Sequence, residues 1–280
     1  MARLKIENID GIISGLDGND EELVKKTGCN LRGVVCHALG IADDALQAAM
    51  APVKIAVVPQ ESDQAADQGL SKAIAEIVRH IGFKAFITGE SNIAGIAEAA
   101  ENGAGVIMMG DDRRFVALNI KTGRLVDNSV ATAKGYVAGL DLMAGGLKGK
   151  KVFITGCGTV GWNAALTALN RGAEVSTFDI DFKRTGKLAG DMKELTGRGV
   201  SLAVSLKSGL WNHQLIMETT NAAEIIEEES IKPGAYIAAP GLPLGLTPAA
   251  IEKVSDKLLH DQMQIGVAVM AVEAVVKGKS

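Results

Sequence analysis

The sequence is short of cysteine, basic charge and long apolar runs, and each shortage excludes a class of protein. The three cysteines form no CxxC pair and no even set. A small secreted domain held by disulfides is therefore excluded, and a reducing cytoplasmic location is expected. No apolar run approaches the roughly 20 residues that span a membrane, so no membrane partner is expected.

The charge balance excludes a second class of protein. The chain has 29 Lys and Arg against 33 Asp and Glu, a formal net charge of −4. Because binding to nucleic acid irrespective of its sequence needs a basic face, no nucleic-acid partner is expected. What the sequence has in quantity is hydrophobic residues, at 47%, and 33 glycines. These predict a packed core with many tight turns.

Strand and helix patterns alternate after about the first 50 residues, which have a helical pattern. Short apolar runs at Lys54–Gln60, Ala85–Gly89 and Gly105–Gly110 predict strands, and helical segments ending in glycine separate them. This order predicts a small parallel sheet. A further strand is predicted at Phe115–Ile120.

A long helix of small residues, Ser129–Gly146, leads into a second α/β pattern. The apolar runs Gln214–Thr220, Ala235–Gly241 and Lys257–Asp261 predict further strands there, before a final helix. The expected fold class is therefore α/β. An N-terminal helical and small parallel-sheet domain, residues 1–128, precedes the linking helix and a Rossmann-like NAD-binding domain, residues 129–280.

A glycine motif in the second half predicts a dinucleotide site. The segment GCGTVG carries Gly156, Gly158 and Gly161, with Thr159 and Val160 between them, after a predicted strand and at the start of a helix. That context is what the GxGxxG motif requires. The first glycine allows the tight turn, the second lets the backbone approach a pyrophosphate, and the third lets helix and strand pack closely. The helix N-terminus offers free N–H groups to the phosphates.

An acid at the end of the next predicted strand indicates which dinucleotide binds. Asp179 is expected to accept hydrogen bonds from the adenosine ribose hydroxyls and to repel a 2′-phosphate, which favours NAD over NADP. Lys183 and Arg184 follow closely and weaken that preference.

Two loops at the carboxyl ends of predicted strands are expected to line the nicotinamide side. In open parallel sheets the ligand binds at that edge. The interpretation assigns Thr220, Pro240 and Gly241 to this lining, with ordinary loop chemistry as the alternative.

Asp111 and Asp112 end the third predicted strand, and two arginines follow at once. A carboxylate in this place is expected to be partly desolvated and can be tuned for proton transfer, although a turn residue fits the same pattern. Asp112 should point the other way and is expected to cap the turn or pair with Arg113 or Arg114. No histidine or further carboxylate nearby completes a ligand set, so no metal site is expected.

Four segments together carry a resemblance to a known family. They are KKTGCNLRGVVCHALG, ENGAGVIMMGDDRRFVALNIKTGRLVDN, VFITGCGTVGWNAA and APGLPLGLTPAAIEK. Over almost the whole chain, from about residue 20 to the final helix, the sequence resembles the pyrrolysine synthase family. The glycine motif is common to many dehydrogenases, whereas the block from Asn102 to Arg124 is far more specific.

The resemblance implies a reaction and two further site residues. Members of the family use NAD to oxidise the primary amine of 3-methyl-D-ornithyl-N6-L-lysine. Ammonia leaves, and ring closure gives pyrrolysine. Asp111 matches the catalytic aspartate beside the reacting amine, Ser62 matches a substrate-binding position, and a homodimer is implied. Leu70 stands where the family has a bulky aromatic residue.

Two other functions fit the same cofactor motif. One is an NAD-dependent amine or amino-acid dehydrogenase with a different substrate. The other is a non-catalytic NAD-sensing protein. Because the second half is expected to bind NAD, the first half is expected to supply the substrate pocket, whether the substrate is the isopeptide or another amine.

Overall fold

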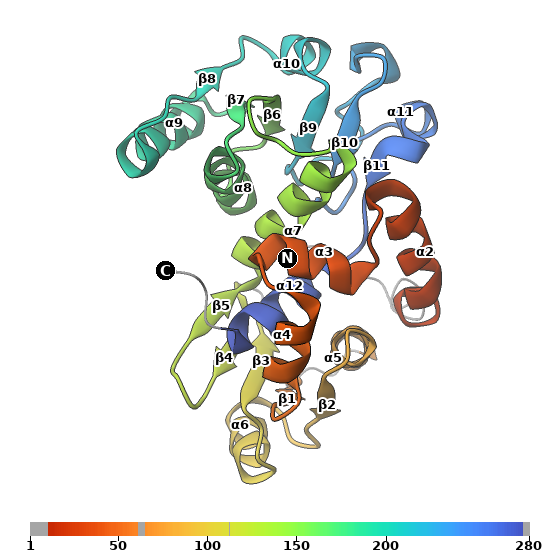
Figure 1. Ribbon diagram of the computed structural model, residues 1–280, viewed down its shortest axis with the longest axis vertical. Helices are drawn as coiled ribbons and strands as arrows, with labels where there is room; N and C mark the ends of the chain where they lie inside the picture. Colours follow the sequence, from red (N-terminus) through yellow and green to blue (C-terminus); the bar gives the residue numbers. More distant parts are fainter. Residues whose placement is uncertain (1–10, 61–64, 112, 277–280) are drawn as a thin grey trace. The chain divides into compact units, whose positions relative to one another are not determined.

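The computed structural model describes residues 11–60, 65–111 and 113–276, which form two compact units. The first unit combines the segment up to Val24, Cys29–Thr132 and the segment from Met263 onward. The second unit combines Lys25–Gly28 with Ala133–Gln262. Both units have α/β architecture, as expected, and Figure 1 colours them along the sequence.

The first unit is built on a five-stranded sheet with the order β2-β1-β3-β4-β5. The strands are β1 (Lys54–Val57), β2 (Lys84–Ile87), β3 (Val106–Gly110), β4 (Phe115–Asn119) and β5 (Leu125–Asp127). β1, β2 and β3 pair in parallel, which confirms the predicted parallel sheet, and β4 and β5 extend it with antiparallel pairing. The carboxyl ends of the parallel strands therefore lie along one edge of the sheet. Asp111 is the first residue after β3 and lies at that edge.

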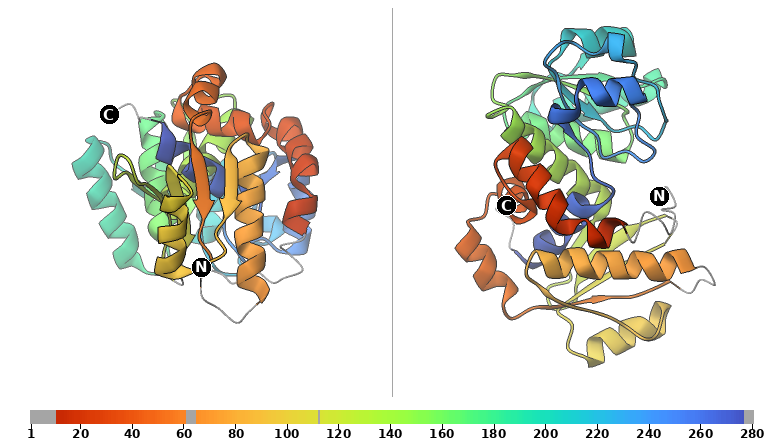
Figure 2. Two further views of the ribbon diagram at one scale, coloured as in Figure 1. Left: turned by 90° about the horizontal axis from the view of Figure 1, so that it is seen from below. Right: turned by 90° about the vertical axis from the view of Figure 1, so that its right-hand side faces the viewer.

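Helices cover both faces of this sheet. They are α3 (Leu31–Leu39), α4 (Asp43–Met50), α5 (Ala65–His80), α6 (Asn92–Glu101) and α12 (Gln264–Val275), with α2 (Leu16–Thr27) preceding them. The right-hand view of Figure 2 shows α5 and α6 on opposite sides of the strands. On the α6 face, Ala99 packs against Ala56 and Ile107, which alternate with residues that point to the other face.

The C-terminal helix α12 belongs to the first unit, whereas the expected domain 129–280 includes it in the second. Its residues from Gln264 to Ala274 are all buried, and it contacts α3, α5 and β4. A helix that is apolar on all sides must be enclosed by other elements, and here the first unit supplies them. The sequence pattern predicted a final helix but not which unit encloses it.

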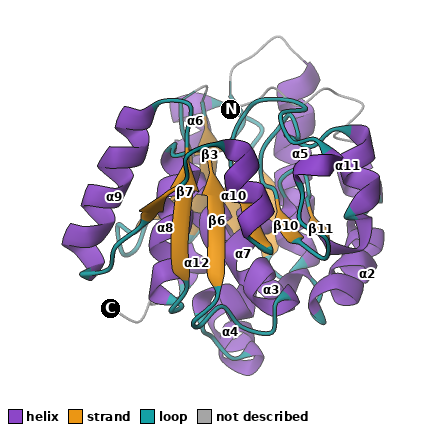
Figure 3. Cartoon of the chain, turned by 90° about the horizontal axis from the view of Figure 1, so that it is seen from above, coloured by secondary structure: helices purple, strands orange, loops and turns teal. Residues whose placement is uncertain are grey.

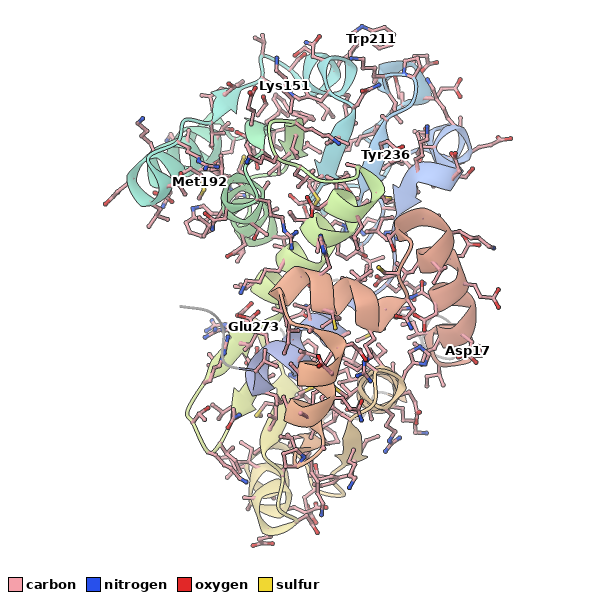
Figure 4. All side chains as sticks on the ribbon, viewed as in Figure 1. Asp17, Lys151, Met192, Trp211, Tyr236 and Glu273 are labelled. Atoms are coloured by element: carbon pink, nitrogen blue, oxygen red, sulfur yellow. The ribbon has the colours of Figure 1, made fainter. Side chains whose placement is uncertain are left out.

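Side chains from the turn between β4 and β5 hold the end of this helix. Asn119 donates to the Ala274 carbonyl at 3.0 Å, and Arg124 lies 3.2 Å from the Glu273 carboxylate. Arg124 also donates to the Val276 carbonyl. The last carbonyls of a helix have no partner within the helix, so these donors satisfy groups that would otherwise stay unpaired. Figure 4 labels Glu273 on α12.

The second unit is a fully parallel sheet with the order β11-β10-β9-β6-β7-β8. The strands are β6 (Lys151–Thr155), β7 (Glu174–Phe178), β8 (Ser201–Leu202), β9 (Leu215–Glu218), β10 (Tyr236–Ala238) and β11 (Leu258–Leu259). The chain runs outward from β6 to β8, then returns to β9 on the other side of β6. The strand order thus reverses between β6 and β9, as in a Rossmann fold. Figure 3 shows β6 and β7 side by side.

Helices again cover both faces of the second sheet. They are α7 (Asn128–Met143), α8 (Thr159–Asn170), α9 (Phe182–Thr196), α10 (Leu206–Asn212) and α11 (Pro248–Lys253), with short 3-10 turns η1 (Glu228–Ser230) and η2 (Ser255–Lys257). α8 and α9 lie on one side of the strands and α10 on the other (Figure 1). None of the helices in the described part of the chain is long and apolar enough to cross a membrane.

Candidate active site

The loop between β6 and α8 accepts only glycine at two of its three motif positions. Gly156 has φ +90, and a Cβ there would lie 3.0 Å from the Thr219 carbonyl oxygen. A Cβ on Gly161 would lie 1.8 Å from the Gly156 carbonyl oxygen. The Thr219 hydroxyl donates to the carbonyls of Thr155 and Gly156, at 2.9 and 2.8 Å. This loop is therefore packed directly against the end of β9, and the close approach predicted for Gly161 is present.

Gly158, in contrast to Gly156 and Gly161, has free space where a side chain would lie. A Cβ built on it would meet no atom within 4 Å, and it is the N-cap of α8 with no side-chain capping hydrogen bond. The first N–H groups of a helix lack intrahelical acceptors, and Thr159 and Val160 carry two of them here. An uncapped helix start beside an open glycine fits the pyrophosphate of a dinucleotide. These residues would hold that group.

Asp179 lies directly after β7, as predicted, and its carboxylate is bonded to the backbone. Oδ2 accepts from the Cys157 N–H at 2.7 Å, and Oδ1 accepts from the Asp181 N–H at 2.9 Å. The side chain is 9% exposed. Each carboxylate oxygen can accept more than one hydrogen bond, so these contacts leave acceptor capacity for ribose hydroxyls. The sequence did not reveal that this acid also fixes the glycine loop.

The two loops expected beside the nicotinamide are in contact with each other. A Cβ on Gly241 would lie 2.3 Å from the Thr220 carbonyl oxygen, and Pro240 directly precedes this glycine. Sequence reasoning missed the residue between them, Glu218. It is fully buried, and its Oε1 accepts from the Thr220 N–H at 2.7 Å and from the Thr220 hydroxyl at 2.5 Å. The sequence does carry a signal that could have singled out Glu218, because it is an acidic residue at the end of an apolar strand.

Burial raises the pKa of Glu218. The hydrogen bonds from Thr220 oppose this rise, as does the nearby Gly245 amide, but burial is the largest cause. The carboxyl group therefore holds a proton more readily than an exposed glutamate does.

Asp111 begins the turn between β3 and β4. Its Oδ1 accepts from the backbone N–H groups of Arg113 and Arg114, both at 2.7 Å, and its own N–H donates to the Arg114 carbonyl. These amides, and then the charges of the two arginines, lower the pKa of Asp111. Oδ2 has no hydrogen-bond partner in the described part of the chain. The turn geometry therefore fixes one oxygen and leaves the other open.

The expectation that Asp111 is partly desolvated is wrong, because its side chain is exposed. Ser62 and Asp112 lie outside the described residues, so their assignments stay predictions. Arg114 is paired with Asp127, with Nη2 and Oδ2 3.0 Å apart. Within residues 11–60, 65–111 and 113–276, no group of three or more His, Cys, Asp or Glu is placed to hold a metal ion.

Comparison with known proteins identifies the first half of the chain. Residues 8–126 match the family described as pyrrolysine biosynthesis protein PylD, N-terminal domain. The pyrrolysine synthase of Methanosarcina acetivorans is 27% identical over 272 residues, which cover 96% of this chain and 98% of that protein. The pyrrolysine synthase of Methanosarcina barkeri is 26% identical, with coverages of 96% and 97%. Over almost its whole length, the chain is similar to these pyrrolysine synthases.

The second half of the chain matches a dehydrogenase domain. Residues 129–235 match the alanine dehydrogenase/PNT C-terminal domain. Quinate dehydrogenase from Corynebacterium glutamicum in complex with NAD has the same fold, with a TM-score of 0.55 and 13% identity over 79% of this chain and 93% of that one. The chain is thus a dehydrogenase-type oxidoreductase with a nicotinamide-cofactor domain, as expected.

Proposed function

We propose that the chain makes pyrrolysine by using NAD to oxidise the primary amine of 3-methyl-D-ornithyl-N6-L-lysine. The observation that carries this proposal is the match to two pyrrolysine synthases over 96% of the chain. The family match of residues 8–126 supports it, because the exposed turn at Asp111 lies in that segment.

The proposed reaction has three chemical stages. The carbon that bears the neutral amine loses a hydride, and the amine becomes an iminium. NAD bound at the glycine loop would supply the hydride acceptor. Water adds to the iminium, and ammonia leaves to give an aldehyde. The second amine of the ornithine part then attacks the aldehyde and loses water, which closes the pyrroline ring. Hydride loss requires a neutral amine, because an ammonium has no lone pair to donate.

Asp111 is proposed to hold the reacting amine through its free oxygen. Its lowered pKa keeps the carboxylate ionised, so it attracts an ammonium group and orients it by a charge-assisted hydrogen bond. A carboxylate with a lowered pKa is a weak base, so the amine proton is expected to pass to water at this exposed turn. Ser62 is proposed to contact the substrate, as the family resemblance implies.

NAD is proposed as the cofactor in preference to NADP. Asp179 stands at the strand end where a ribose hydroxyl is recognised and a 2′-phosphate is repelled. Arg184, a possible anchor for that phosphate, has its Nε 3.5 Å from the Asp181 carboxylate. A titration that finds NADP bound as tightly as NAD would contradict this preference.

The alternative function is an amine or amino-acid dehydrogenase that acts on another substrate. The match of residues 129–235 to the alanine dehydrogenase domain supports this alternative. Purified protein with NAD and the synthetic isopeptide separates the two proposals. The proposed function predicts NADH with the isopeptide and little with free amino acids. The alternative predicts the reverse.

The family resemblance also leads us to propose a homodimer. Light scattering of the purified chain tests it, because the 29.1 kDa chain should then scatter at twice that mass. A mass of one chain at working concentration would contradict the dimer.

A further inference from the structure

Glu218 is the last residue of β9 and stands at the point where the strand order reverses. Its register partner on β6 is Thr155, which directly precedes the glycine loop. Ligands of open parallel sheets bind outside the carboxyl ends of the strands at this point. Ile216, two residues earlier, lies in a buried apolar cluster with Leu246. Side chains two apart on a strand share a face, so the Glu218 carboxyl extends into the core.

The carboxyl group lies between the two loops expected to line the nicotinamide side. On one side, Thr220 binds its Oε1. On the other side, a Cβ on Gly241 would be 3.1 Å from Oε2, and a Cβ on Gly245 would be 2.8 Å from the carboxyl carbon. Glycines at these positions give the carboxyl its space. The side chain therefore fixes the spacing of the two loops.

One carboxyl oxygen of Glu218 is left without a partner. Oε2 is fully buried and no described residue meets hydrogen-bond geometry with it, although the Gly245 amide lies near enough to oppose the rise of the carboxyl pKa. The groups that face the carboxyl are Thr155 of β6, Thr220 of the loop after β9, and Gly241 and Gly245 of the loop after β10, none of which is charged. Among the residues that the structure describes, no charged side chain contributes to the shift of its pKa. A buried carboxylate with neither a cation nor a full set of donors is unfavourable, so the neutral acid is favoured.

The two oxidation states of a nicotinamide differ in charge. The oxidised ring is a cation, whereas the reduced ring is neutral. A cation close to a buried carboxyl group favours its ionised form, and the effect is stronger away from water. We propose that Glu218 stores a proton and gives it up when the oxidised nicotinamide binds. This inference rests on the proposed use of NAD, and it assigns Glu218 a role as a positioning and charge-setting residue.

The proposal makes a directional prediction for pH. Without ligand, the pKa of Glu218 is raised, and with NAD bound it should be lower. Between those two pKa values, NAD affinity should rise about tenfold for each pH unit, because binding releases a proton there. Below both values and above both values the affinity should be flat. The affinity for NADH should change little over the same range.

Calorimetry of the full chain in buffers with different ionisation enthalpies tests this. We expect up to one proton released on binding NAD, and none on binding NADH. Glu218→Gln retains an oxygen for Thr220 and resembles the neutral acid, so proton release should be lost while NADH still binds. Glu273→Gln is the matched control, since Glu273 is a buried glutamate of the first unit, and it should leave the release unchanged.

The outcomes separate this proposal from the proposed function. NAD binding by the natural chain without proton release at any pH would overturn the role of Glu218 alone. Proton release that persists in Glu218→Gln would do the same. Failure of the natural chain to bind either nucleotide would overturn the use of NAD and this inference together. If Glu218→Gln does not fold, the pH series on the natural chain still tests the role, because NAD affinity that stays flat at every pH would overturn it.

Discussion

The carboxylate of Asp179 accepts a hydrogen bond from the backbone N–H of Cys157, at 2.7 Å. This contact joins the acid that follows β7 to the glycine loop that follows β6. The residue predicted to recognise the ribose therefore also holds the loop predicted to bind the phosphates. Both parts of the predicted nucleotide site therefore depend on one side chain.

Replacing that side chain should damage stability and cofactor binding together. In Asp179→Ala, the buried Cys157 N–H loses its acceptor, which should lower the free energy of unfolding by about 1–3 kcal/mol. NAD affinity should fall at least about tenfold, which corresponds to about 1.4 kcal/mol. Chemical denaturation and calorimetry measure the two effects. Asp256→Ala, at an exposed aspartate of the same unit, is the control, and equal behaviour of the two variants would contradict the assignment.

The glycine loop offers a pair of substitutions with different expected effects. Gly161→Ala places a Cβ 1.8 Å from a backbone oxygen, so the unit should lose at least about 1–3 kcal/mol of stability. Gly158→Ala meets no atom within 4 Å, so its melting temperature should stay close to that of the natural chain. Its affinity for NAD should nevertheless fall, because the methyl group occupies the approach of the pyrophosphate. Normal NAD affinity in Gly158→Ala would contradict the phosphate assignment.

Asp111 should be needed for turnover and not for cofactor binding. Asp111→Asn keeps an oxygen for the turn amides but removes the charge that attracts the ammonium. We expect NAD to bind normally and turnover of the isopeptide to fall by about two orders of magnitude or more, because the reacting amine loses the group that orients it. Steady-state kinetics and an NAD titration check this, and near-normal turnover would refute the role.

The lowered pKa of Asp111 also fixes the direction of its pH dependence. Its carboxylate is present above that pKa and is lost as the pH falls through it. Turnover should therefore not decline because of Asp111 until the pH drops below the ordinary range of an aspartate. A pH–rate profile of the natural chain tests this. A loss of turnover near neutral pH that disappears in Asp111→Asn would contradict it.

Part of the block most specific to the family has a structural role. Arg124 binds Glu273 and the Val276 carbonyl at the end of α12. Arg124→Ala should remove one cation beside a mostly buried glutamate and a donor to the Val276 carbonyl, and lower the free energy of unfolding by about 1–3 kcal/mol. Arg113→Ala is the matched control, since Arg113 is exposed and forms no ion pair with a described residue, and should change stability by no more than about 0.5 kcal/mol. Equal unfolding curves would contradict the anchoring role.

The sequence was sufficient to predict the main strands and the position of the glycine loop. Short apolar runs and glycine stops are local signals, and β1, β2, β3, β6 and β7 lie where they were predicted. β5 and β8 were missed, although β10 and β11 are equally short and were predicted. β10 and β11 are mostly buried and read as apolar runs, whereas β8 is exposed, β5 is only partly buried, and neither carries such a run. The unit that encloses α12 depends on contacts between distant segments, which a local pattern does not encode.

The site shows the same limit. The positions of Gly156, Gly161 and Asp179 followed from motif spacing, but the hydrogen bond from Cys157 to Asp179 required the folded backbone. Glu218 was read as part of a strand, because its burial between two glycines becomes visible only when the loops after β9 and β10 are brought together. Asp111 was expected to be desolvated because an apolar run precedes it, yet the turn carries it out to solvent.

The most direct test of the central claim is one reaction of the natural chain with NAD and synthetic 3-methyl-D-ornithyl-N6-L-lysine. Absorbance measures the NADH that forms, and mass spectrometry measures the mass of the product. The proposed function predicts one NADH per substrate consumed and a product lighter than the substrate by one ammonia and two hydrogen atoms. No NADH from this isopeptide, with NADH formed from another amine, would contradict it.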